Sequence, residues 1–357
     1  MLAGGAASVQ AAAATTRVYA VVASYSDTQA SSRGPSKLAK ILRSVRAFYA
    51  EGSDGAHEFI GDVHPRVLEL AQPRPEGSCR LPDAAVLSAA LRGAGVEMAR
   101  YDALVLVVPS STQGCTGGLQ TAFAHRDADG RARPVPLAVS WSLTDRFIAH
   151  EILHTHGLGH ARTLICRGAS LAADCTTKEY GNVWDLMGNG SFQMLSAPLR
   201  KRMGWTEPIV HAGGRATYTI GAATRPGGLP TAVQVPLAFT GSDSVTVTQQ
   251  LQLWIEYRPP IGFDKRMAAP SLVNFAAGAM INVTGAWRGR VGRAVRRLAC
   301  PLTSPCLIDT TPYPGSFNDA GLPVGQSWTE PLSGTQITVE SRTETSLTVS
   351  VMTAGKP

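Results

Sequence analysis

The chain has 357 residues and a formal net charge of +7, with 44% hydrophobic and 17% charged residues. These proportions exclude a disordered chain, and no apolar run reaches the roughly 18 residues that a membrane-spanning helix needs. Because the length exceeds that of a typical single domain, we expect two domains, each with a substantial core.

The amino-terminal half alternates predicted strands and helices. Residues 1–16 are rich in alanine and lack both the positive start and the strongly apolar stretch of a secretory signal, so they are interpreted as a leader or tail. Runs of β-branched residues then predict strands, and apolar residues at helical spacing predict helices. The expected strands are residues 18–24, 59–63, 101–108 and 136–141, and the expected helices are residues 35–49 and 83–91. This alternation predicts α/β layering.

A metal-binding motif follows the last of these strands. The eleven residues that begin at His150 read HEILHTHGLGH and fill every fixed position of HExxHxxGxxH. On a helix, His150 and His154 face the same side, so both imidazoles can reach one ion. Glu151 lies one residue further round, where its carboxylate can act as a general base on water without being a ligand. Gly157 tolerates a positive φ, which lets the chain leave the helix and return His160 to the metal. Three neutral imidazoles leave a fourth position open, so the motif predicts a catalytic Zn²⁺ site.

This signature resembles that of the metzincin metallopeptidases, and a methionine turn follows it. Met187 lies in a Gly-flanked Asp-Leu-Met-Gly segment, and its thioether is predicted to pack beneath the imidazoles without binding zinc. With the later Leu-Ser-Ala-Pro-Leu-Arg-Lys-Arg-Met-Gly-Trp segment that ends at Trp205, the turn is most similar to the gametolysin (autolysin) family, and immune-inhibitor-A-like peptidases are near neighbours. Asn189 stands where astacins and serralysins carry a switching tyrosine ligand, so none is expected there. His156 lies off the ligand positions and is expected to support the site or to be exposed.

After Trp205 the sequence changes to short strand-like segments separated by Gly and Pro turns, a pattern typical of an antiparallel β-sandwich. These segments are residues 216–220, 232–237, 244–257, 279–283, 336–339 and 346–351. We therefore expect a metzincin-like zinc peptidase domain at residues 17–207, of the α+β or α/β class, with a mixed twisted sheet and a long zinc-binding helix. An all-β antiparallel sandwich is expected at residues 208–357.

The six cysteines form an even set, and none of their spacings suggests a second zinc site. Pairing cysteines that close short loops predicts the disulfides Cys166–Cys175 and Cys300–Cys306, which leaves Cys79 to pair with Cys115. Other pairings of the six cysteines remain open. Such disulfides favour an oxidising compartment and hence a secreted protein. Cys79 also begins a Cys-Arg-Leu-Pro-Asp segment that echoes the cysteine switch of matrixins, which is an alternative to its disulfide.

The basic residues form only one dense run: Arg288, Arg290, Arg293, Arg296 and Arg297, beside Trp287. A solvated basic face explains this run, and adhesion to an acidic polymer such as a cell wall is the alternative. The other arginines are scattered along the chain, so no nucleic-acid partner is expected.

The sequence therefore predicts a secreted zinc endopeptidase in which Glu151 takes the proton of a zinc-activated water and returns it to the leaving amine. The expected partner is a protein or peptide, and the gametolysin resemblance suggests a cell-wall or extracellular-matrix glycoprotein. Two other classes stay open. One is a zinc-dependent hydrolase of a non-peptide amide, and the other is a catalytically silent adhesion or binding protein. The sequence predicts neither the oligomeric state nor the cleavage preference.

Overall fold

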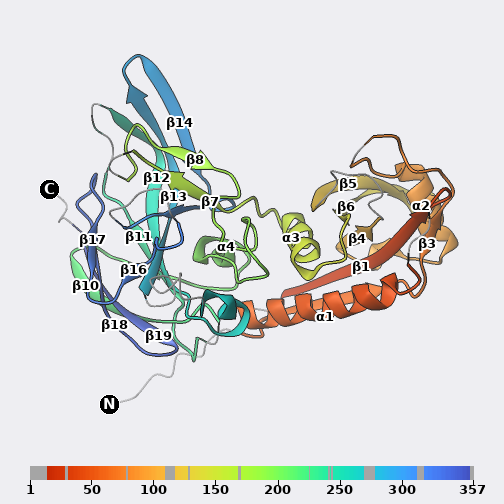
Figure 1. The fold of residues 1–357 in the computed structure, drawn as a ribbon, viewed down its shortest axis with the longest axis horizontal. Coiled ribbons are helices and arrows are strands. Elements are labelled where there is room, and N and C mark those ends of the chain that lie inside the picture. The colour runs from red at the N-terminus through yellow and green to blue at the C-terminus, as the bar shows by residue number, and fades with distance from the viewer. Residues whose placement is uncertain are drawn as a thin grey trace.

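The computed structural model describes residues 14–28, 31–77, 79–108, 117–127, 129–167, 170–224, 226–239, 242, 244–268, 278–311 and 317–353. These residues form a mostly β protein with mixed sheets and few helices. The molecule is elongated, with one sheet and its helices at one end and the remaining sheets at the other (Figure 1). No helix in the described ranges is long and apolar enough to cross a membrane.

The amino-terminal sheet is mixed, as predicted. Its strands are β1 (Ala14–Tyr25), β2 (His57–Val63), β3 (Leu68–Leu70), β4 (Ala103–Val107), β5 (Gly118–Arg126) and β6 (Ala132–Ser140). They are arranged in the order β2-β1-β4-β6-β5, with β3 paired to β1. The first four of that order are parallel neighbours, whereas β5 runs antiparallel to β6 and forms one edge. β1 begins at Ala14, within the segment interpreted as a leader or tail.

Helices cover both faces of this sheet, which explains why β4 is apolar along its whole length and β1 is apolar from Val18 to Ala23. The helices are α1 (Gly34–Gly52), α2 (Ala84–Gly93) and α3 (Asp145–Thr155). Val18 and Val22 of β1 pack in the cluster that contains α1 and α3, whereas the alternate residues Val21 and Ala23 pack in the cluster that contains α2. Side chains thus alternate between two separate cores.

The predicted metal-binding helix is α3, and it is short. It has 11 residues, whereas α1, the longest helix among the described residues, has 19. The expectation of a long zinc-binding helix is therefore not met. α3 ends at Thr155 because Gly157, with a φ of +78°, turns the chain out of the helix two residues later.

The carboxy-terminal half contains two further sheets. One has nine strands in the order β8-β7-β15-β13-β12-β11-β9, with β14 and β16 paired to β13, and the other has the order β10-β19-β18-β17. Ile255 and Ile281 of the first sheet and Val339 and Val349 of the second belong to one core cluster, so the two sheets pack face to face. The bounds are β7 (Arg162–Ile165), β8 (Thr176–Lys178), α4 (Ala197–Arg202), β9 (Ile209–Val210), β10 (Arg215–Gly221), β11 (Ala232–Pro236), β12 (Val245–Tyr257), β13 (Gly278–Val291), β14 (Ala294–Cys300), β15 (Cys306–Ile308), β16 (Leu322–Pro323), β17 (Ser327–Thr329), β18 (Gln336–Arg342) and β19 (Ser346–Met352).

Two features of this half differ from the predicted antiparallel sandwich. The β11–β9 and β15–β7 pairs are parallel. In each pair one partner, β9 or β7, precedes the strands of the expected sandwich in the chain. The β7–β8 hairpin precedes residue 207, so the nine-stranded sheet draws strands from both sides of the predicted domain boundary.

The predicted disulfides Cys166–Cys175 and Cys300–Cys306 are confirmed. Cys79 is also disulfide-bonded, which leaves no thiol for a cysteine switch. Its predicted partner, Cys115, lies outside the described residues. The arginine run is exposed on the hairpin of β13 and β14, and none of its members forms an ion pair with a described carboxylate.

Candidate metal centre

The three signature histidines converge on one point. Nε2 of His154 lies 3.0 Å from Nε2 of His150 and 3.1 Å from Nε2 of His160. Among the described residues they are the one group of three or more His, Cys, Asp or Glu side chains close enough to hold a metal ion. Two come from α3 and the third from the loop that Gly157 opens.

The hydrogen bonds on the far side of each ring determine what the Nε2 atoms can do. Nδ1 of His150 lies 2.8 Å from the carbonyl oxygen of Leu186, and Nδ1 of His154 lies 2.7 Å from that of Leu158. Since a carbonyl oxygen only accepts, both Nδ1 atoms must carry the proton and donate it. In the neutral rings of His150 and His154, both Nε2 atoms then carry a lone pair and no proton. Two lone pairs cannot form a hydrogen bond with each other.

A cation at the convergence point would resolve this repulsion. Zinc–nitrogen bonds of about 2.0–2.1 Å at tetrahedral angles hold two nitrogens roughly 3.3 Å apart, close to the separations found here. Burial favours the neutral rings that a metal requires: it lowers the pKa of His150 to about 3 and also lowers that of His154. The residues present therefore fit a zinc ion.

The methionine turn lies directly against this cluster. Leu186 supplies the carbonyl that orients His150, and the carbonyl of Met187 accepts from the backbone amide of Ala161, next to His160. Met187 itself is fully buried in the core cluster that contains α3. Asp185 shapes the turn, because its Oδ1 accepts from the amide of Met187 at 2.8 Å and its Oδ2 from the amide of Ser196 at 2.7 Å.

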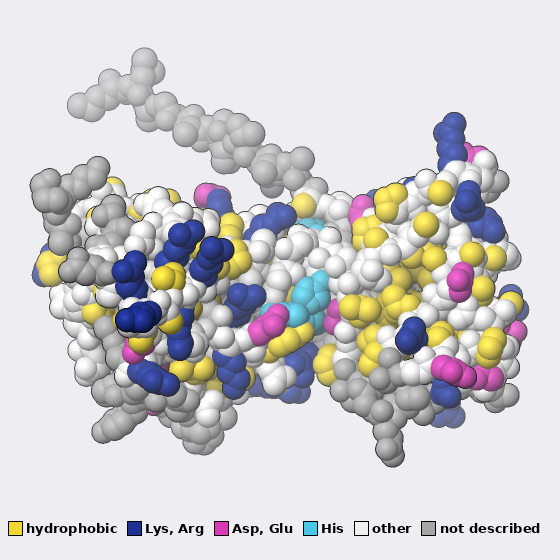
Figure 2. All heavy atoms as spheres, turned by 90° about the horizontal axis from the view of Figure 1, so that it is seen from above, with side chains coloured by type: hydrophobic (Ala, Val, Ile, Leu, Met, Phe, Trp, Pro, Cys, Tyr) yellow, Lys and Arg dark blue, Asp and Glu magenta, His cyan; other side chains and the backbone are white. Residues whose placement is uncertain are grey.

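Glu151 is 4% exposed and lines a cleft of about 300 Å³ together with His150. Burial raises the pKa of Glu151 to about 8, a range in which a carboxyl group can both take and return a proton near neutrality. Gly118 at the start of β5 permits this placement, since a Cβ there would lie 2.3 Å from Cγ of Glu151. Histidine side chains reach the surface near the middle of the molecule, between its two halves (Figure 2).

Comparisons with known proteins do not assign a family. No protein-family model matches the sequence, and no curated protein matches it. Among solved structures, the chain is similar to OgpA from Akkermansia muciniphila at 12% identity and a TM-score of 0.32, over 82% of this chain and 94% of that one. Those values are too low to carry an inference about fold or function.

His156 lies apart from the ligand atoms, in a buried network behind them. Its Nε2 lies 2.9 Å from the hydroxyl of Tyr49 and 3.4 Å from Oγ1 of Thr16. Thr16 also contacts Nε2 of His57, whose Nδ1 accepts from the indole of Trp205 at 2.9 Å. The signature is thus joined to the Gly-Trp segment through hydrogen bonds, and His156 supports the site without facing it.

Two residues at the site were missed by sequence reasoning. Oε1 of Glu179 lies 2.7 Å from Nδ1 of His160, so it orients the third ring as the carbonyls orient the other two. The ring of Tyr180 lies over His160, with centroids 3.7 Å apart, and lines the cleft at a φ of +57°. A Glu-Tyr pair before the turn has no motif of its own, and only the position of His160 in space gives it a role.

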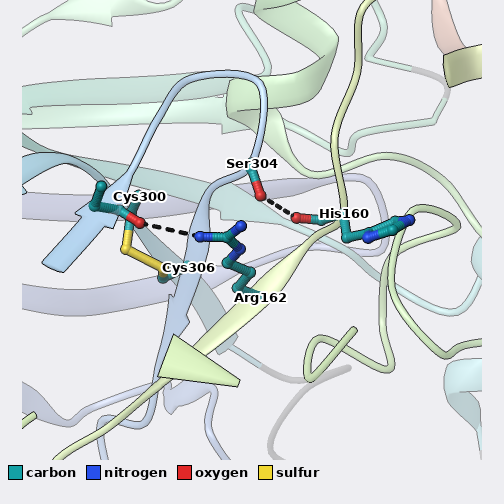
Figure 3. The surroundings of a disulfide bond; sticks show 6 residues. His160, Arg162, Cys300, Ser304 and Cys306 are labelled. Atoms are coloured by element: carbon teal, nitrogen blue, oxygen red, sulfur yellow. Dashed lines mark hydrogen bonds between the residues drawn. A yellow bond between two sulfur atoms is a disulfide. The ribbon is translucent and has the colours of Figure 1, made fainter. Parts of the chain in front are cut away.

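His160 is also held by the loop that the Cys300–Cys306 disulfide closes (Figure 3). Oγ of Ser304 donates to the carbonyl of His160 at 2.5 Å. The amide of Gly159 donates to the carbonyl of Thr303, and that of Arg162 to the carbonyl of Pro305. Gly159, His160 and Arg162 are therefore all bonded to one short loop of the carboxy-terminal sheet.

Opening this loop is expected to weaken metal binding. In a Cys300→Ser/Cys306→Ser variant we expect zinc affinity, measured by competition with a chromophoric chelator, to fall by about 10–100-fold, the usual effect of losing the groups that orient a ligand. Cys166→Ser/Cys175→Ser, which opens the far end of the β7–β8 hairpin, is the control and should change affinity much less. Equal affinities in the two double variants would show that the loop does not hold His160.

Proposed function

We propose that the protein is a secreted zinc-dependent endopeptidase of the metzincin type, most similar to the gametolysins. The observation that carries the proposal is the convergence of three Nε2 lone pairs beside a buried carboxylate in an open cleft. Two disulfides support maturation in an oxidising compartment, as expected for a secreted protein.

In this proposal His150, His154 and His160 hold the metal. When bound, zinc supplies a Lewis acid that lowers the pKa of a water molecule from about 15.7 to about 7. Glu151 takes the proton of the attacking water and returns it to the leaving nitrogen. Leu186, Leu158 and Glu179 keep each imidazole in the tautomer that presents its Nε2 lone pair.

The position of β5 supports a peptide over a small amide as substrate. β5 is the last strand in the order of its sheet, and Gly117 and Gly118 at its start line the cleft with Glu151. The edge of a strand offers backbone amides and carbonyls in the spacing of another extended chain. A peptide lying along β5 would therefore pass the candidate base.

Metal removal tests this function. We expect one zinc ion per chain, loss of casein or gelatin cleavage after treatment with a chelator such as 1,10-phenanthroline, and recovery on adding back Zn²⁺. A serine-protease inhibitor serves as the control and should have no effect. Zinc binding with cleavage of small amides alone would support the non-peptide hydrolase instead, and zinc binding without any hydrolysis would support a silent binding protein.

A further inference from the structure

Arg146 lines the metal-site cleft and two hollows that adjoin it. It lies one helical turn before His150 on α3, so the two side chains leave the same face of the helix. One of the hollows measures about 630 Å³, and its polar lining includes Arg146, Asn189, Ser191, Gln193 and Arg266. The two arginines are the only charged residues in that lining.

No described carboxylate pairs with the guanidinium of Arg146. Its Nη2 donates to Oδ1 of Asn189 at 3.0 Å, and its Cζ lies 5.0 Å from the ring centroid of Phe147. Its Nε is buried without a hydrogen-bond partner. The side chain of Arg146 is half-buried, so its charge is partly withdrawn from water and would gain from pairing with an anion. A carboxylate that enters the cleft could supply that pairing.

The carboxylates near Arg146 and Arg266 do not neutralise the two guanidinium groups. The second hollow, of about 640 Å³, is lined by Arg146, Lys265 and Arg266 and by the carboxylates of Glu51 and Asp145. Oε1 of Glu51 accepts from the backbone amide of Phe263, and Oδ1 of Asp145 accepts from the backbone amide that follows it. Arg266 donates to Oγ of Ser191, a neutral group. Neither carboxylate forms an ion pair with Arg146 or Arg266, and both arginines donate to neutral oxygens.

We propose that the hollow between Arg146 and Arg266 is a subsite for a substrate carboxylate, so that the enzyme prefers peptides with Asp or Glu near the scissile bond. The proposal rests on the proposed peptidase function. The subsite is close to the reaction because Arg146 and Asn189 line both the hollow and the cleft that contains Glu151. A guanidinium fork binds a carboxylate through two parallel hydrogen bonds, which gives discrimination against the neutral amide as well as affinity.

The first test is the cleavage pattern of the zinc-loaded protein. Sequencing the products of a denatured casein digest should show Asp and Glu enriched at one fixed position relative to the cut. Peptides built on one such site, with Glu or Gln at that position, should then differ in kcat/KM by about 10–100-fold, the discrimination expected from one charged hydrogen-bonded pair. The difference should lie mainly in KM, because the contact exists before and during the reaction.

Arg146→Gln should bring the Glu-to-Gln ratio close to one while zinc content stays unchanged. Arg288→Gln, which removes an exposed arginine of the β13–β14 hairpin, is the matched control and should keep the ratio. Cleavage without acidic enrichment, or a preference that persists in Arg146→Gln, would overturn the subsite and leave the peptidase function standing. If no peptide is cleaved, the peptidase function fails. In that case the affinities of the labelled Glu and Gln peptides for the zinc-loaded protein, measured by fluorescence anisotropy, test the subsite without cleavage. Tighter binding of the Glu peptide supports the subsite, and equal affinities overturn it.

Discussion

Replacing Glu151 with alanine is expected to lower kcat/KM for casein or gelatin by about 10²–10⁴-fold, the usual contribution of a positioned general base. Zinc stoichiometry should remain at the parent value, because the three ligands are histidines whose orientation depends on Leu186, Leu158 and Glu179. Proteolysis and bound zinc are measured on the same sample. If Glu151→Ala cleaves casein as fast as the parent, the assignment of the base is wrong.

Glu179→Gln is the informative companion variant, because it alters the second carboxylate of the site. Glu179 bonds His160 and has a side chain 58% exposed, so its replacement should weaken zinc binding with a smaller effect on the rate of the zinc-saturated enzyme. The two variants therefore separate proton transfer from ligand orientation. A similar loss of rate in both, at saturating zinc, would argue that Glu151 does no more than support the ligands.

The candidate site was predictable where its geometry is local in sequence. His150 and His154 share a helical face by spacing alone, and Gly157 is the one residue type that leaves a helix in the left-handed conformation without steric cost. The groups that orient the rings were not predictable. Ser304 is 144 residues from His160 in the sequence, and their contact exists only once the β15–β7 pair has formed.

The strands also differ in how well the sequence predicts them. β1 and β4 were found because both faces of each are buried, which requires unbroken apolar runs. β5 was missed because it is an edge strand whose residues are mostly accessible, so its sequence GLQTAFAHR alternates weakly and begins with glycine. The glycine that weakens the strand signal is Gly118, which makes room for Glu151. The site thus requires a glycine at a position where a β-branched residue would have made the strand easier to predict.

A buried ionic network fixes the methionine turn against the carboxy-terminal sheets. Arg258, fully buried at the end of β12, bonds both oxygens of Asp264 at 2.6 Å. Its Nη2 also donates to the carbonyl of Trp184 at 2.9 Å and to that of Met194 at 2.8 Å. These two carbonyls lie on either side of Met187 in the chain. The turn beside the candidate metal site is therefore held by a residue of the other half of the protein.

Replacing Arg258 with methionine is accordingly expected to cost about 3–5 kcal/mol of unfolding free energy, since it leaves the buried carboxylate of Asp264 without its partner. Urea unfolding monitored by tryptophan fluorescence measures the loss. Lys201→Met, which breaks the exposed Lys201–Glu207 pair, is the control and should cost less than about 1 kcal/mol. Adding Asp264→Leu to Arg258→Met should recover part of the loss, because the unpaired charge is then removed as well. A full loss that Asp264→Leu does not relieve would mean that the two carbonyl contacts, and not the ion pair, hold the turn.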